Sequence, residues 1–195
     1  KLITCHLGNG ASICGIKNGQ SQITSMGFTP IAGLMMGTRS GDLDPSVVTF
    51  IQEEKGLSAS EMNQVLNNES GLLGVSELSN DFRDVIASAE DNVEQSVVAL
   101  DIFTSKVKQT IGAYAAELGG VDGIIFTAGI GENSAWVREK CCEGLEFLGA
   151  KIDKELNKTS EEIISTTDSS TTVLVVPTNE ELMIAKETMA IISSK

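Results

Sequence analysis

The sequence predicts an α/β fold in which helices pack on a mixed β-sheet. Three short apolar segments separated by Gly-containing turns open the chain, a pattern typical of antiparallel strands joined by hairpins. Two later apolar segments are each followed by a helical stretch, which predicts parallel strands with helices between them. With 195 residues, 41% of them hydrophobic, the chain can bury a core of its own, and we treat it as one domain.

The first part of the chain predicts three strands and a long loop. The strands are expected over 2–7, 11–17 and 20–25, and the turns Gly8-Asn9-Gly10 and Asn18-Gly19 join them. Residues 26–44 are rich in Gly and Met and show no periodicity. An ordered loop of this length usually has a functional role.

The middle of the chain predicts helices. Asp44 is a suitable N-cap and Pro45 a suitable first residue for a helix over 46–55. Ser58 or Ser60 with Glu61 predicts a second helix that runs to Leu66, and a Gly-containing loop is expected over 67–74. A short helix over 79–87 and a long helix over 91–118 follow, the latter with an apolar stripe at Val97, Leu100, Phe103, Val107, Ile111 and Tyr114. We interpret residues from about 26 to 92 as an insertion.

The last part of the chain predicts two strand-loop-helix units. The first has a buried strand over 121–126, a loop over 127–132 and a helix from 133 to about 147. The second has a strand over 173–176, a loop over 177–179 and a helix over 180–192, while the polar stretch 153–170 is ambiguous. Ligands of such sheets bind at the carboxyl ends of the strands, so we expect the loops there to form the site.

Composition excludes several classes of function. The 14 Lys and Arg residues against 27 Asp and Glu residues give a net charge of −13 without a basic stripe, so nucleic-acid binding is not expected. No apolar run approaches the roughly 20 residues of a membrane span. Four cysteines and one histidine match neither a disulfide framework nor a zinc site, which favours a soluble cytoplasmic protein with reduced thiols. The chain starts at Lys1 inside a strand-like run, which suggests an excised domain.

Two Gly-rich motifs could bind phosphate. The hairpin His6-Leu7-Gly8-Asn9-Gly10 could direct backbone N–H groups at phosphate oxygens, although, taken by itself, the motif is better explained by an ordinary hairpin turn with a buried histidine at a strand end. At 126–134 a buried strand breaks at Gly129 and Gly131 and enters a helix, whose N-terminus favours an anion. The spacing matches neither a P-loop nor a dinucleotide-binding motif, and the alternative is a strand-helix turn capped by Asn133 or Ser134.

Three further motifs carry charged side chains. Glu180, just beyond a strand end, could serve Mg²⁺ through water, or its negative charge could simply interact favourably with the positive end of the helix dipole. Arg39, held between glycines at 37–42, could bind carboxylate or phosphoryl oxygens, or it could form a surface pair with Asp42 or Asp44. Asp81-Phe82-Arg83 could place Arg83 on a base or a phosphate, or it could lie on a solvated helix face.

Taken in order, these motifs resemble one family. The signature of the acetate kinases is similar to two runs in this chain, SMGFTP at 25–30 and GLMMGTRSGDLDP at 33–45. The other motifs fall where that family has its nucleotide and metal segments, and the resemblance covers essentially the whole chain. It matches the carboxyl-terminal half of a two-domain enzyme of the acetate and sugar kinase, Hsp70 and actin superfamily. This implies a ribonuclease H-like, actin-like ATPase domain with helices on both faces of the sheet.

The resemblance also implies roles for individual residues. Arg39 would stabilise the transferring phosphoryl group, Pro30 would help line the acetate pocket, and Glu180 would serve Mg²⁺. The residues that would hold ATP or ADP are His6, Leu7, Gly8, Asn9, Gly10, Asp81, Phe82, Arg83, Gly129, Ile130, Gly131, Glu132 and Asn133.

The implied reaction is the reversible conversion of ATP and acetate to ADP and acetyl phosphate by direct in-line transfer. The amino-terminal domain, which would supply a further Arg, a His, an Asp and a metal-binding Asn, has no counterpart in this chain, so we expect the isolated chain to be inactive. A homodimer is expected. The alternatives are a propionate kinase, an Hsp70-like or actin-like ATPase, and a non-catalytic dimerisation domain that uses the long helix.

Overall fold

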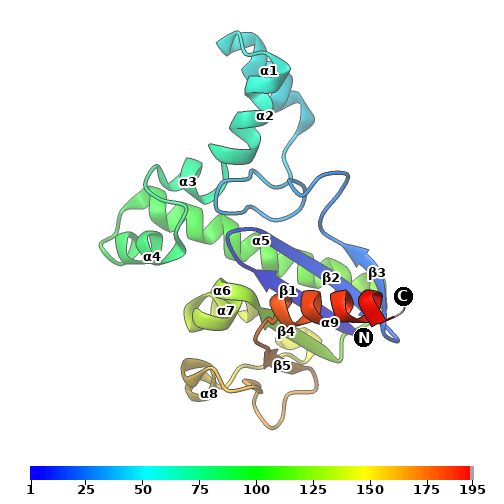
Figure 1. Ribbon diagram of the computed structural model, residues 1–195. Coiled ribbons are helices and arrows are strands. Elements are labelled where there is room, and N and C mark those ends of the chain that lie inside the picture. The colour runs from blue at the N-terminus through cyan, green and yellow to red at the C-terminus, as the bar shows by residue number, and fades with distance from the viewer. Residues whose placement is uncertain (194–195) are drawn as a thin grey trace.

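A five-stranded mixed sheet forms the centre of the computed structural model, which describes residues 1–193 (Figure 1). Its strands are β1 (Leu2–Leu7), β2 (Ala11–Lys17), β3 (Gln20–Thr24), β4 (Gly123–Thr127) and β5 (Thr172–Val175). They are ordered β3-β2-β1-β4-β5, with antiparallel pairing among the first three and parallel pairing of β1 with β4 and of β4 with β5. The mixed sheet predicted from the sequence is confirmed.

The parallel register brings the predicted motifs to one edge of the sheet. His6 of β1 lies opposite Thr127 of β4, and Phe126 of β4 lies opposite Val175 of β5. The carboxyl ends of these strands therefore meet, so the segments that follow them start side by side. This edge is where ligands of open α/β sheets bind.

The core lies between the sheet and the long helix α5 (Glu94–Leu118), which packs on β1 and β2. Alternate residues of β1, namely Ile3, Cys5 and Leu7, are fully buried, as expected for a strand with one face against the core. The apolar stripe predicted on α5 is buried from Leu100 to Tyr114. The prediction was wrong at Val97, which is 39% exposed because Ser96 and Ala99 take the inward positions of that turn.

Local capping signals located two helix starts correctly. In α1 (Pro45–Lys55) the Asp44 carboxylate accepts a hydrogen bond from the Ser46 amide at 2.9 Å. In α2 (Ala59–Asn68) Ser58 and Glu61 form a capping box. The helix predicted over 79–87 begins later, as α4 (Phe82–Glu90), because Asp81 is its N-cap. Together α1 and α2 form an arm that extends away from the sheet (Figure 1).

Two segments predicted as loops are helical. Residues 67–74 contain the end of α2 and the start of α3 (Gly71–Ser76), whose Leu72 and Leu73 amides donate to the carbonyls of Met36 and Gly37. Residues 127–132 contain most of α6 (Ala128–Asn133), which starts directly after β4. In both cases the first amides of the helix donate to acceptors other than the carbonyls of that helix. The local sequence pattern does not reveal these acceptors.

The remaining helices follow the predicted order with shifted ends. The helix expected from 133 to about 147 is α7 (Ala135–Cys142), which packs against α5, followed by a short 3₁₀ turn at Glu146–Leu148. The ambiguous polar stretch contains α8 (Lys154–Thr159).

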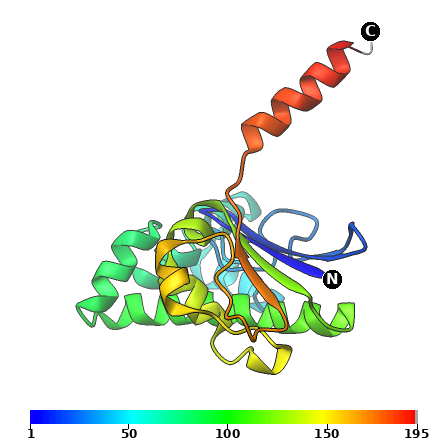
Figure 2. The same cartoon turned by 90° about the horizontal axis from the view of Figure 1, so that it is seen from below.

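The last helix, α9 (Glu180–Ser193), stands away from the rest of the molecule on the side of the sheet opposite α5 (Figure 2). It buries no residue, and its exposed apolar side chains are Leu182, Met183, Ile184, Met189, Ile191 and Ile192. Among residues 1–193, no helix has both the length and the apolar character needed to cross a bilayer.

Candidate functional site

A large pocket of about 800 Å³ lies between the β1–β2 hairpin turn, the start of α4 and α6. Eight of the residues predicted to hold a nucleotide line it: Gly8, Asn9, Asp81, Phe82, Arg83, Gly129, Ile130 and Asn133. Three segments that are far apart in the sequence therefore meet at one concave surface. This volume is in the range of small-molecule and cofactor sites.

A small pocket of about 410 Å³ adjoins the large pocket and shares Gly129 with it. It is lined by His6, Ala128, Gly129, Thr178, Asn179, Glu180 and Glu181. The His6 Nε2 atom lies 3.9 Å from the Glu180 Oε1 atom. The structure thus places the predicted metal carboxylate beside the histidine at the end of β1.

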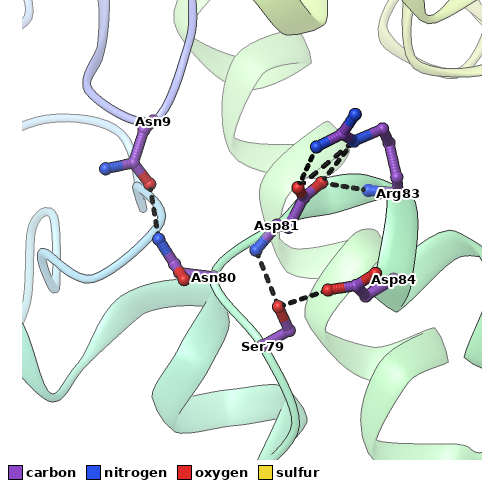
Figure 3. Close-up of polar contacts among 6 residues, drawn as sticks. All are labelled: Asn9, Ser79, Asn80, Asp81, Arg83 and Asp84. Carbon is purple, nitrogen blue, oxygen red and sulfur yellow. Dashed lines mark hydrogen bonds and ion pairs between the residues drawn. The ribbon is translucent and has the colours of Figure 1, made fainter.

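The rim of the large pocket carries an Asp81–Arg83 pair (Figure 3). The Arg83 Nε donates to Asp81 Oδ1 at 3.0 Å and its Nη2 to Oδ2 at 2.5 Å, while the Arg83 amide donates to Oδ1 at 2.9 Å. These hydrogen bonds from Arg83 lower the pKa of Asp81 to about 2. The pair has the geometry of a capped helix start on a solvated face, with the Arg83 side chain 89% exposed.

Asn9 connects the hairpin turn to two other segments. Its side-chain Oδ1 accepts a hydrogen bond from Asn80 Nδ2 at 3.1 Å, as Figure 3 shows, and its backbone carbonyl accepts one from the Gly37 amide at 2.9 Å. A Cβ atom at position 37 would overlap the Asn9 Oδ1 atom, so a side chain there would displace the Asn9 amide from its contact with Asn80. Asn9 therefore holds the Arg39 loop and the start of α4 against the hairpin.

Arg39 lies on the hairpin side of its loop. Its Nη1 donates to the Pro30 carbonyl at 3.2 Å, and it approaches the turn so closely that a Cβ at Gly10 would lie 3.3 Å from Nη1. Glycine at position 41, with φ of +72°, allows the loop to turn back after the arginine. The structure thus brings the predicted catalytic residue and the predicted substrate residue Pro30 into contact.

The carboxylates that could have neutralised Arg39 are engaged elsewhere. Asp42 accepts hydrogen bonds from Lys106 Nζ at 2.9 Å and from the Gly33 amide at 2.8 Å, and Asp44 caps α1. Burial raises the pKa of Asp42, but these hydrogen bonds outweigh it and the pKa is lowered. Within residues 1–193, Arg39 has no carboxylate within 4.0 Å, so the surface-pair interpretation is wrong.

Four of the predicted nucleotide residues, Leu7, Gly10, Gly131 and Glu132, line neither of these two pockets. Leu7 and Gly131 are buried. Phe82 lines the large pocket, and its ring packs edge-on against Phe103 at 4.5 Å between centroids. The Glu132 carboxylate accepts hydrogen bonds from the Ala128 amide and from Thr178. Burial raises the pKa of Glu132, but these hydrogen bonds outweigh it, and the pKa lies below its ordinary value.

The comparisons with known proteins agree with this geometry. A family model described as the Acetokinase family matches residues 1–186. The chain belongs to this family. It is 56% identical to the acetate kinase of Carboxydothermus hydrogenoformans, over 100% of this chain and 49% of that protein. The chain therefore spans about half the length of the curated relatives it matches.

Solved structures show the same relationship. The crystal structure of Porphyromonas gingivalis acetate kinase superposes with a TM-score of 0.94 at 47% identity, over 98% of this chain and 49% of that one. A propionate kinase from Francisella tularensis superposes with a TM-score of 0.90 at 42% identity, over 95% of this chain and 48% of that one. The acetokinase fold is therefore shown for this chain.

The small pocket is lined by two carboxylate residues, Glu180 and Glu181, which are of the type that Mg²⁺ prefers. Within the described part of the chain no three His, Cys, Asp or Glu side chains gather to form a metal cage. Mg²⁺ in nucleotide sites usually has one or two carboxylates, with water and phosphate oxygens as its other ligands. The Glu180 side chain, 71% exposed in the small pocket, fits that mode.

Sequence reasoning missed several residues around the pockets. Ile86, Ala87 and Glu90 line the large pocket at helical spacing from Arg83, so extending the periodicity of α4 would have found them. Asn80 and Ser134 also line it. Arg138 of α7 is fully buried and supports the carbonyls of Gly131 and Glu132 from behind the site. A single arginine in a helical stretch of sequence does not indicate that its side chain is buried.

Proposed function

We propose that this chain is the carboxyl-terminal, nucleotide-binding half of an acetate kinase, with residues from about 26 to 92 as an insertion. The observation that carries the proposal is that the two pockets adjoin at Gly129, which lines both of them. The large pocket, with apolar Ile86, Ala87 and Ile130 in its wall, suits a base and ribose. The phosphates would then extend towards His6 and Glu180.

Transfer would proceed directly between nucleotide and acetate, with positioning and charge stabilisation as the main contributions of the protein. Arg39, which has no carboxylate within 4.0 Å among residues 1–193, would contact the transferring phosphoryl group, and Pro30 beside it would line the acetate pocket. Glu180 would hold Mg²⁺ through water, and the ion when bound would neutralise charge on the phosphate oxygens. His6 and the hairpin amides would also hold the phosphates.

The second half of the enzyme would complete the cleft. Because α9 buries none of its residues and Phe28, beside Pro30, is fully exposed, we infer that an amino-terminal domain covers them in the full-length protein. Phe50 and Val47 of the protruding α1 are also exposed, which supports the expectation of a homodimer. All four cysteines are free thiols, which supports a cytoplasmic location.

Propionate is the less favoured acceptor, because the relatives that cover the whole chain at 56% identity are named acetate kinases. One methylene in a hydrophobic pocket changes the transition-state free energy by only about 1–3 kcal/mol, so both acids belong in the test. An Hsp70-like or actin-like ATPase would hydrolyse ATP without either acid.

The experiment is an end-product assay on the full-length protein that carries this chain. ATP and Mg²⁺ are supplied with acetate, with propionate or with no acid, and acyl phosphate is trapped with hydroxylamine while ADP is measured. Acetyl phosphate formation that equals ADP formation supports the proposal. ADP release that is independent of acid would contradict it.

A further inference from the structure

One oxygen of Glu132 holds two segments of the site together. Its Oε1 accepts hydrogen bonds from the Ala128 amide at 2.8 Å, from the Thr178 amide at 2.9 Å and from the Thr178 hydroxyl at 2.7 Å. Ala128 begins α6 with φ of +66°, a conformation that costs energy for a residue with a side chain. Glu132 thus fastens the start of its own helix to the connection between β5 and α9.

Thr178 is the last residue before α9 that is held by the body of the protein. Before it, the Val176 amide donates to the Phe126 carbonyl at 2.9 Å. After it, the Leu182 and Met183 amides donate to Asn179, and no residue of α9 up to Ser193 is buried. Glu180 lies only two residues beyond Thr178, so the position of its carboxylate depends on where Thr178 is held.

We propose that Glu132 is a positioning residue for the metal carboxylate: by clamping Thr178 it holds Glu180 beside His6 at the phosphate end of the site. This inference deepens the proposed function, because it rests on Glu180 serving Mg²⁺. It gives Glu132 a different role from the direct nucleotide contact expected from the family motif. Residues that orient a metal ligand in this way commonly affect metal affinity by about 10–100-fold.

The first test measures the clamp without any reaction. Hydrogen exchange of the backbone amides in 176–183 is compared in the full-length protein and its Glu132→Gln and Thr178→Val variants. Glutamine removes the charge but keeps the size, and valine removes only the hydroxyl donor. The matched control is Glu155→Gln, which changes an exposed carboxylate on α8. We expect faster exchange in both site variants and wild-type exchange in the control.

The second test measures the consequence for Mg²⁺. In both site variants the Mg²⁺ concentration that gives half-maximal binding of ADP should rise about tenfold. The rate of acyl phosphate formation should be closer to the wild-type rate at saturating Mg²⁺ than at low Mg²⁺. Combined with Glu180→Gln, neither site variant should add a further tenfold loss, because both would act through the same carboxylate.

Two outcomes would overturn the inference. Exchange in 176–183 that stays at the wild-type rate in Glu132→Gln would show that there is no clamp. A Mg²⁺ shift in Glu132→Gln without one in Thr178→Val would show that only the charge of Glu132 matters. If the wild-type protein makes no acyl phosphate, the proposed function fails, while the exchange measurement still decides whether the clamp exists.

Discussion

Replacing Arg138 with methionine tests how the body of the site is held in place. The guanidinium is fully buried and donates five hydrogen bonds, all to neutral acceptors. The acceptors are the carbonyls of Gly131, Glu132 and Asn157, the Asn157 side-chain oxygen and the Ser160 hydroxyl, at 2.6 to 3.0 Å. Methionine fills the volume of the aliphatic stem but removes all five of these hydrogen bonds. The Glu132 and Asn157 carbonyls keep one longer bond each, from the Ser160 hydroxyl at 3.3 Å and from the Ser160 amide at 3.2 Å.

The expected loss follows from this geometry. An acceptor left buried without a partner costs about 1–3 kcal/mol, and the remaining Ser160 contacts compensate for part of the loss. We therefore expect Arg138→Met to lower the free energy of unfolding by about 2–5 kcal/mol. Arg138→Lys keeps the charge but has three donors in place of five, so its loss should be intermediate.

Urea unfolding of the chain, followed by the fluorescence of its single tryptophan, Trp136 of α7, measures this loss. The control is Lys154→Met, which removes an exposed cation paired with Glu139 and should change stability by less than about 0.5 kcal/mol. A loss below about 1 kcal/mol for Arg138→Met would refute the argument that the buried guanidinium supports α6.

Three further predictions concern the pockets. Gly37→Ala should push Asn9 out of its contact with Asn80. We expect this change to lower the free energy of unfolding by about 1–3 kcal/mol and to weaken ADP binding. A wild-type affinity for ADP, measured by titration calorimetry, would contradict this prediction. The pKa of Asp81 is lowered to about 2, so the stabilisation from its ionised carboxylate is present above the unfolded pKa near 3.8 and is lost as the pH falls towards 2. Asp81→Asn should therefore flatten this part of the curve of unfolding free energy against pH. An unchanged slope in the variant would contradict this prediction. The chain alone should gain about 2.7 kcal/mol of stability at an ADP concentration of 100 times Kd, yet form no acetyl phosphate with ATP and acetate; robust turnover by the chain alone would be the contrary result.

Local signals were sufficient for much of the fold. Alternating apolar residues and Asn-Gly or Gly-Asn-Gly turns predicted β1, β2 and β3 to within a residue, and Asp44 and the Ser58–Glu61 box predicted two helix starts. Each of these features satisfies its own hydrogen bonds within a few residues. The helices α3 and α6 were missed because their first amides are satisfied by Met36, by Gly37 and by the Glu132 carboxylate. Those partners exist only once the chain has folded.

The site was predictable to a similar degree. The Gly-rich motifs and Glu180 could be assigned to one edge because parallel strands bring their carboxyl ends together. The sequence could not show that Asp42 pairs with Lys106, 64 residues away, rather than with Arg39. It also could not show that Glu132 turns to Thr178, or that Arg138 is buried behind α6.

We propose that Arg39 stabilises the phosphoryl group during transfer between ATP and acetate, and the proposed function depends most on this role. Steady-state kinetics of Arg39→Ala and Arg39→Lys in the full-length protein test it most directly, with folding checked by circular dichroism. Arginines in this role contribute about 10³–10⁵ in rate, so alanine should lower kcat and kcat/KM together by a factor of that size. Lysine keeps the charge but lacks the planar fork, and it should remain severely impaired. Near-normal kcat in both variants would contradict the claim.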